Sequence, residues 1–297
     1  MSSQSRRDFL KTAGLIGAGA VGLKPQKAQA APKKVVADDR MGVLIDTTMC
    51  IGCRRCEYAC KITHDLPTEP EESFDDRSGF KKMRRPDEST LTVVNEYPPA
   101  HNPNLPTNVK VQCMHCDHPA CVSACIVGAF SKEENGSVIW NESLCIGCRY
   151  CMVACPFQIP ANEYYRALQP EIRKCDFCFE RTKLGLVPAC VDICPVEALT
   201  YGKRFELLKL ARRKIDSNGR RYIDHIYGQF EAGGTSWMYL AGQEFTNLGL
   251  PALTSEPAPG ATESLQHAIF AYFIPPALLF SLLGGIMWIN RKTDEAE

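Results

Sequence analysis

The sequence lacks an excess of charge of either sign: its 297 residues include 34 basic and 34 acidic side chains, so the formal net charge is zero. Nucleic acid is therefore not expected among its partners, because proteins that bind it usually carry a basic surplus. A hydrophobic fraction of 45% excludes disorder along most of the chain. This length allows one large domain or two small ones.

The sequence also lacks a recognisable catalytic constellation. It contains only six histidines, and no paired acid–base site, nucleophile motif or phosphate-binding loop stands out. We therefore expect bond-making chemistry to belong to a partner subunit, with this chain as a non-catalytic component.

Cysteine, in contrast, is abundant. The sixteen cysteines make up about 5% of the chain, which exceeds ordinary usage. They fall into four groups of four, and groups one and three have the C-x2-C-x2-C-x3-C spacing of bacterial ferredoxins. In chain order the groups are Cys50, Cys53, Cys56 and Cys60; Cys113, Cys116, Cys121 and Cys125; Cys145, Cys148, Cys151 and Cys155; and Cys175, Cys178, Cys190 and Cys194.

Iron–sulfur chemistry explains this spacing. Three cysteines in a tight loop reach three iron corners of a [4Fe–4S] cube, and a fourth cysteine from elsewhere must cap the remaining corner. Gly52 and Gly147, which follow the first cysteine of their loops and directly precede the second, let the backbone approach the sulfides. Zinc prefers separated ligand pairs, and disulfides at this cysteine density would be strained. Zinc and disulfides remain the alternatives, and clusters are the favoured interpretation.

Between the cysteine groups the chain reads as short strands and turns, so we expect an α+β fold. Asn135-Gly136 predicts a hairpin turn, and the apolar spacing at 204–216 predicts an amphipathic helix. Apolar segments that read as strands lead into groups one to three and follow groups two and four, at 43–45, 109–111, 137–140, 129–130 and 198–201.

The expected organisation is two ferredoxin-like modules. Residues 109–160 carry groups two and three and form the inner module, whereas 41–64 and 170–203 carry groups one and four and form the outer module. The insertion 65–108 interrupts the outer module, and its basic run from Lys81 to Arg85 is either a docking patch or, as we favour, a solvated loop face. Residues 204–262 are expected to hold the helix and a partner-docking extension.

Both ends of the chain predict targeting to a membrane. Residues 1–30 combine paired arginines, a short apolar run and a small-x-small site, as in a twin-arginine export signal. Residues 265–290 include a long uncharged run that would span ~30 Å as a helix, which predicts a transmembrane anchor. Arg291 and Lys292 then place the C-terminus in the cytoplasm. The predicted location is the periplasmic face of the bacterial inner membrane.

The four groups in this order, and the stretch 145–156 above all, resemble the four-cluster iron–sulfur subunits of exported, quinone-linked oxidoreductases. Formate dehydrogenase-N, dimethyl sulfoxide reductase and membrane-bound hydrogenase complexes have such a subunit. The export signal and the anchor are most similar to the hydrogenase electron-transfer subunit. The resemblance covers residues 41–292, and the chain departs from it at Ile126, where a proline commonly follows the cysteine.

This resemblance implies four [4Fe–4S] clusters with crossed fourth ligands. The implied ligand sets are Cys50, Cys53, Cys56 and Cys194 (set 1); Cys175, Cys178, Cys190 and Cys60 (set 2); Cys113, Cys116, Cys121 and Cys155 (set 3); and Cys145, Cys148, Cys151 and Cys125 (set 4). It further implies an electron relay between an exported catalytic subunit and an integral-membrane quinone- or haem-binding subunit. A hydrogenase is the first expectation for the catalytic partner, and a molybdenum or tungsten oxidoreductase is the second.

Two other functions remain open: a free-standing, membrane-tethered polyferredoxin shuttle, and a partner of a multihaem cytochrome. Arg54, Arg55 and Arg149 lie inside the ligand loops, where they either raise the potential of their cluster or only face solvent. His267 precedes the expected span and either meets a quinone or haem or, as we favour, is a polar interfacial residue.

Overall fold

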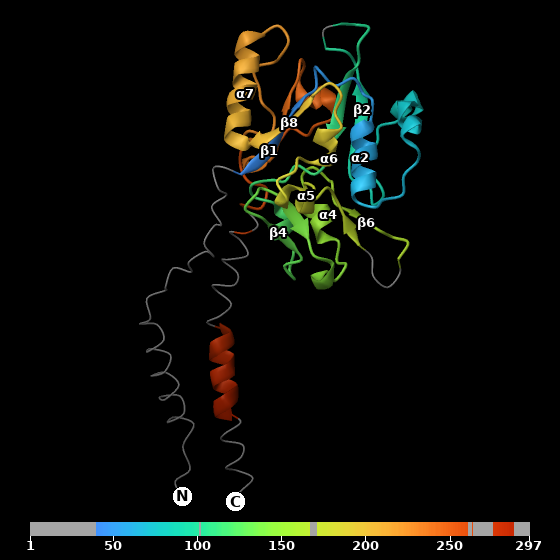
Figure 1. The fold of residues 1–297 in the computed structure, drawn as a ribbon. Coiled ribbons are helices and arrows are strands. Elements are labelled where there is room, and N and C mark those ends of the chain that lie inside the picture. The colour runs from blue at the N-terminus through green and yellow to red at the C-terminus, as the bar shows by residue number, and fades with distance from the viewer. Residues whose placement is uncertain (1–39, 101, 167–170, 261–262, 264–275, 288–297) are drawn as a thin grey trace, which may run out of the picture. The chain divides into compact units, whose positions relative to one another are not determined.

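The computed structural model describes residues 40–100, 102–166, 171–260, 263 and 276–287 (Figure 1). The chain divides into two compact units, one of which is Val36–Ala261 and holds all four cysteine groups. The other unit is formed by the two ends, Met1–Val35 and Thr262–Glu297.

A three-stranded sheet lies at the centre of the large unit. β1 (Met41–Asp46) pairs with β8 (Leu199–Lys203) in antiparallel orientation and with β9 (Trp237–Leu240) in parallel orientation. Val43 packs with Trp237 towards the cysteine-rich core, whereas Leu44 packs against α7 (Arg204–Ser217), which lies beside the sheet (Figure 1). Because alternate strand residues point to opposite faces, both faces of β1 and β9 are covered, and these two strands are almost entirely buried.

A second, two-stranded sheet joins the insertion to the core. It consists of β2 (Val93–Tyr97) and β3 (Thr107–Val111), which pair in antiparallel orientation. Two short 3-10 helices, η1 (Glu71–Asp75) and η2 (Arg77–Lys81), precede it. The insertion is thus ordered along its described length, and its Phe74 ring packs edge-on against Tyr58 at 5.6 Å between centroids.

The cysteine groups lie on short helices that pair across the chain. Group one continues into α2 (Arg55–Thr63), which packs on α6 (Ala189–Asp192) of group four, while α3 (Ala120–Ser123) of group two packs on α4 (Tyr150–Ala154) of group three. The remaining elements are β4 (Phe130–Lys132), β5 (Val138–Trp140), η3 (Glu142–Leu144), β6 (Ala161–Asn162), β7 (Ile172–Arg173), α5 (Phe179–Lys183), η4 (Glu231–Gly233) and η5 (Phe245–Leu248).

The strands and the helix predicted beside the cysteine groups are confirmed. The helix expected at 204–216 is α7, and the expected hairpin is formed by β4 and β5, with Gly136 at φ 93 in its turn. Residues 204–262 were expected to hold a helix and a partner-docking extension. Beyond the helix, however, this stretch contributes β9 to the central sheet. Every side chain from Trp237 to Ala241 is fully buried.

The predicted C-terminal transmembrane helix, part of the expected fold, is wrong. Within the described ranges, no helix is both long and apolar enough to cross a membrane. Of the predicted span, residues 276–287 are described, and they are helical. The remainder of the predicted span, 265–275 and 288–290, lies outside the described residues.

The predicted localisation is wrong together with this anchor. A single-pass attachment at the periplasmic face of the membrane, with a cytoplasmic C-terminus, required a spanning helix that the described residues do not contain. The predicted export signal at 1–30 and His267 lie outside the residues that the structure describes.

Candidate metal centres

All sixteen cysteines lie within the described residues, and none of them forms a disulfide. Only Cys148 is exposed, while the other fifteen are buried or half-buried. Free thiols held inside a protein at this density are unusual unless they bind metal. The geometry therefore disfavours the disulfide alternative and leaves thiolate-bound metal.

The loops of groups one and three turn at matching positions. Arg54 and Arg149 adopt left-handed conformations, with φ 58 and 60, and a helix begins at the next residue in each case. Gly52 and Gly147 have φ 71 and 69, conformations that favour glycine. Each loop therefore reverses direction between its first and third cysteines, as a ligand loop wrapped around a metal core requires.

Gly52 is fixed sterically as well as by its backbone conformation. A Cβ atom added there would lie 2.4 Å from Oδ1 of Asn108, whose Nδ2 donates a hydrogen bond to the Cys50 carbonyl at 3.1 Å. The β3 strand thereby holds the first ligand loop in place.

Groups two and four share a different pattern. His115 and Phe177, each just before the second cysteine of its group, have positive φ values, and their rings lie 5.0 Å apart. His115 is fully buried, and its Nδ1 accepts a hydrogen bond from the Val138 amide at 2.8 Å. Burial, aided by the charge of Lys174, lowers the pKa of His115 well below its ordinary value, so the ring is neutral. It acts as a packing and hydrogen-bonding residue between the two groups.

Set 1 comes together around one cavity. Cys50, Cys53, Cys56 and Cys194 all line it, although Cys194 is distant in the sequence. Burial, together with the charges of Cys53 and Cys194, raises the pKa of Cys50 to about 11. The thiolates of this set therefore repel one another, and a positively charged metal core would stabilise them.

Set 2 gathers residues from groups one and four, and all four of its cysteines are buried. Burial raises the pKa of Cys175 well above its ordinary value, and the charge of Cys60 contributes in the same direction. Burial, together with the charge of Cys190, likewise raises the pKa of Cys178 to about 12.

Sets 3 and 4 gather in the same way. Burial is the largest cause of a raised pKa at Cys116, and the charges of the three other members of set 3 also raise it; these are Cys113, Cys155 and Cys121. Burial and the charges of the other members of set 4 together raise the pKa of Cys151 to about 11; these members are Cys145, Cys148 and Cys125. The charge of Cys155, the last cysteine of group three, therefore acts on group two, and the charge of Cys125, the last cysteine of group two, acts on group three.

The donor chemistry fits clusters with sulfur ligands. Four thiols per set, all buried or half-buried except Cys148, suit a thiophilic metal. Burial disfavours their anionic form unless a cationic core compensates the charge. One mixed group also lies within metal-ligand spacing, His64, Asp176 and Cys178. Its His64 Nε2 is already 2.8 Å from Asp176 Oδ1, and its Nδ1 is 2.9 Å from the Cys60 carbonyl. This histidine therefore joins groups one and four by hydrogen bonds.

The loop arginines are held by protein groups. Arg54 lies over the Phe74 ring at 5.3 Å and reaches Glu57 at 3.4 Å, and the half-buried Arg55 pairs with Glu71 at 3.0 Å. Arg149 lies over the Tyr164 ring at 5.7 Å. The charges of Arg54 and Arg55 are thus partly neutralised by carboxylates.

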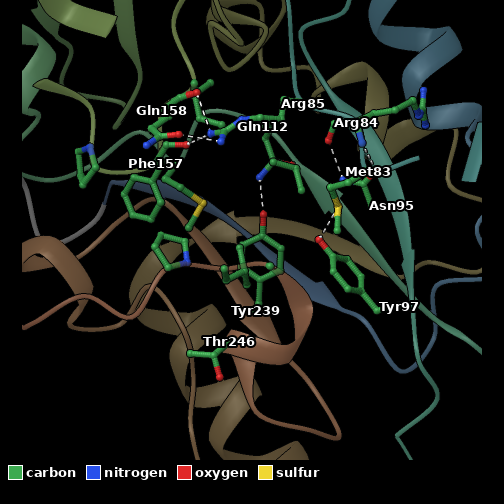
Figure 2. Close-up of a pocket in the computed structure, with 17 residues that line it drawn as sticks. Met83, Arg84, Arg85, Asn95, Tyr97, Gln112, Phe157, Gln158, Tyr239 and Thr246 are labelled. Carbon is green, nitrogen blue, oxygen red and sulfur yellow. Dashed lines mark hydrogen bonds between the residues drawn. The ribbon is translucent and has the colours of Figure 1, made fainter. Parts of the chain in front are cut away.

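We favoured a solvated loop face for the basic run 81–85, and this prediction is correct for only part of the run. Lys81, Lys82 and Met83 are exposed, but Arg84 binds the buried Glu57 carboxylate at 2.6 Å. Arg85 donates hydrogen bonds to the carbonyl groups of Phe157 and Gln158, beside a pocket of about 410 Å³ (Figure 2). These two arginines fasten the insertion to the body of the protein.

Sequence reasoning missed two charged residues among the cysteines, Lys110 and Lys174. Both are buried, and both lie just before a cysteine group in the sequence. A lysine in a sequence is normally read as a surface residue, so their position before Cys113 and Cys175 was the only available signal.

Comparison with known proteins gives consistent similarities. Residues 107–204, which contain groups two to four, match the 4Fe-4S dicluster domain family. A protein of Nitratidesulfovibrio vulgaris is 47% identical over 89% of this chain and 72% of its own length. The hydrogenase-2 operon protein HybA of Escherichia coli O157:H7 is 30% identical over 98% of this chain and 97% of its own length. The B subunit of the anaerobic dimethyl sulfoxide reductase of Haemophilus influenzae is 38% identical over 57% and 77%, respectively.

Proposed function

Because the protein is a member of the family of ferredoxin-type iron–sulfur electron-transfer subunits that includes HybA and the B subunit of dimethyl sulfoxide reductase, we propose that it relays electrons through four [4Fe–4S] clusters within an oxidoreductase complex. Membership of this family means that the protein carries [4Fe–4S] clusters. Each cluster, when bound, supplies one-electron redox chemistry at a potential set by its surroundings. The protein's own task is to hold, insulate and space these centres.

The sixteen cysteines are the proposed ligands, in sets 1 to 4 as defined from the sequence. The observation that carries this assignment is the gathering of each set around a fourth cysteine from a different group. Cys194 lines the cavity of Cys50, Cys53 and Cys56, and the charge of Cys155 acts on Cys116. The inner and outer ferredoxin modules are supported by the pairing of β4 with β5 and of β1 with β8.

The proposed order of the relay is set 1, set 2, set 3, set 4. Three links between neighbouring sets support it, because the charges of cysteines in adjacent sets act on each other. Cys56 responds to Cys190, Cys175 to Cys113, and Cys121 to Cys151, in each case with burial as the larger cause of a raised pKa. A row of this kind has two ends, and two partners are needed to make it a relay.

The proposed partners are a catalytic oxidoreductase subunit and a quinone-reactive membrane subunit. The relatives support the first: one is a protein of the hydrogenase-2 operon and another is a component of dimethyl sulfoxide reductase. Exposed apolar side chains around set 4 support docking at that end, since such clusters mark interaction sites. They are Ile126, Ile146, Tyr150 and Val153.

Purification from the native host under anaerobic conditions, in mild detergent, tests this proposal. We expect a large catalytic subunit to co-purify, and hydrogen gas to reduce the clusters of the purified complex if that subunit is a hydrogenase. Molybdenum or tungsten in the same preparation would instead identify the second class of catalytic partner. A protein that purifies alone and is reduced by neither route would contradict the relay and favour the free-standing shuttle.

A further inference from the structure

Two lysine side chains are buried among the cysteines, Lys110 and Lys174. Lys110 is 2% exposed and Lys174 is 6% exposed. Within the described part of the chain, neither forms a salt bridge with a carboxylate, whereas Lys214 lies 2.9 Å from Asp46. A buried ammonium group is costly unless an opposite charge compensates it, so the structure implies a negative charge that comes from another source.

Lys110 is held rigidly beside set 1. It lines the cavity of set 1, and its Nζ donates a hydrogen bond to Gln112 Oε1 at 3.0 Å and lies 4.6 Å from the centre of the Trp237 ring. Gln112 Nε2 donates to the Tyr239 hydroxyl at 2.9 Å (Figure 2), and that hydroxyl donates to the Lys110 carbonyl at 2.9 Å. This closed network fixes the position of the ammonium group.

Lys174 occupies a comparable place further along the row. Its Nζ donates hydrogen bonds to the carbonyl groups of Val138 and Cys175 and lies 5.8 Å from the centre of the Phe130 ring. All of these partners are neutral, so they orient the ammonium group without cancelling its charge.

The charges that face each lysine come from neighbouring sets. Although burial lowers the pKa of Lys110, the charges of cysteines in sets 1 and 2 raise it above its ordinary value; these are Cys190, Cys56, Cys175 and Cys60. Lys174 directly precedes Cys175 of set 2, and the two residues that its Nζ contacts, Phe130 and Val138, pack with Cys121 of set 3. The nearby Asp176 carboxylate also acts on Lys174, although the two form no salt bridge among the described residues.

We propose that Lys110 and Lys174 are interior counter-charges shared between neighbouring clusters, and that they raise the reduction potentials of the clusters held by sets 1, 2 and 3. This inference rests on the proposed function. A cluster with four thiolate ligands becomes more negative when it is reduced, and a fixed positive charge in a low-dielectric interior stabilises the reduced form.

The test is a redox titration of the purified full-length holoprotein, followed by electron paramagnetic resonance. Lys110→Met should lower the potentials of two clusters, so that the ratio of reduced to oxidised cluster falls about tenfold at a fixed ambient potential, which is about 59 mV for one electron. Lys110→Arg, which keeps the charge, should stay near the wild type. The signal that Cys148→Ser perturbs identifies set 4, and it should not move in Lys110→Met.

Lys209→Met is the matched control, because this lysine is exposed and pairs with Glu206 at 3.1 Å on α7. Unchanged potentials in Lys110→Met, with iron content equal to wild type, would overturn the proposal. Should Lys110→Met or Lys174→Met lose iron, retention of iron in the corresponding Arg variant supports the counter-charge, and loss in the Arg variant as well contradicts it. Absence of four cluster signals from the wild-type protein would instead refute the proposed function.

Discussion

At the scale of single residues, interior charges decide how the cysteine groups are supported. Glu57, next to Cys56 on α2, is 1% exposed and accepts hydrogen bonds from Arg84 at 2.6 and 2.9 Å. It also accepts a hydrogen bond from the Val94 amide at 2.6 Å. One carboxylate thus joins group one, the basic run of the insertion and β2.

Replacing this carboxylate should be strongly destabilising. We expect Glu57→Ala to lower the free energy of unfolding by about 3 kcal/mol, since it leaves the charge of the partly buried Arg84 without a carboxylate and the buried Val94 amide without an acceptor. Thermal unfolding of the anaerobic holoprotein measures the change. Glu71→Ala is the control: Glu71 pairs with Arg55 at 3.0 Å, but the two side chains are 38% and 42% exposed, so its effect should stay below about 1 kcal/mol. Equal effects of the two substitutions would refute this role for Glu57.

The residue scale also shows what the sequence could and could not predict. The cysteine ligand groups and the role of the two loop glycines could be predicted from the sequence, because ligand spacing and backbone conformation are local properties. Lys110 was not readable, because its burial depends on Gln112, Trp237 and the cysteines of two distant groups. Arg84 was not readable for the same reason, since its partner Glu57 lies in another element.

At the scale of elements, the backbone turn of the first ligand loop depends on contacts with a neighbouring strand, β3. We expect Gly52→Ala to lower the iron content by about one cluster, because its Cβ would collide with Asn108 on β3 at a position with φ 71. Gly185→Ala is a matched control with φ 76 and open space around the added atom; it should keep its iron and lose only about 1–2 kcal/mol of stability. Full iron content in Gly52→Ala would show that the loop tolerates a side chain.

The junction between α7 and the loop before β9 gives a second prediction at this scale. Arg204 begins α7, and its guanidinium donates hydrogen bonds to the carbonyl groups of Thr235, Gly228 and Gln229 at 2.7 to 3.0 Å. Lysine lacks this planar set of donors, so Arg204→Lys should destabilise the protein by about 1–3 kcal/mol.

Chemical denaturation of Arg204→Lys, compared with Arg212→Lys, separates this role from a general effect of the substitution. Arg212 is on the same helix, is half exposed and pairs only with the exposed Asp224 among the contacts described for it. A stability loss in Arg212→Lys as large as in Arg204→Lys would contradict the assignment.

The elements differ in how far the sequence predicted them. α7 was predictable because Leu207, Ala211 and Ile215 recur at helical spacing and face the sheet. β9 was not, because its four residues are buried on both faces and show no alternation of polar and apolar side chains. Its parallel partner β1 is almost 200 residues away, so only the assembled fold reveals the strand.

At the scale of the whole molecule, the four sets differ in how well the protein shields them. All four cysteines of set 2 are buried, whereas set 4 includes the exposed Cys148. A chelator should therefore remove iron from set 4 before set 2, since access limits the reaction of a bound thiolate. Brief chelation followed by alkylation and mass spectrometry measures this order: Cys145 and Cys148 should be labelled before Cys175 and Cys190. Labelling in the opposite order would contradict the proposed shielding.

The most direct measurement of the central claim is the amount of iron and acid-labile sulfide bound by each anaerobically purified polypeptide. Four crossed sets that use all sixteen cysteines require about sixteen irons and about sixteen sulfides per polypeptide, at four of each per cluster. A value near eight irons, or bound zinc in place of iron, would contradict the account of a four-cluster relay.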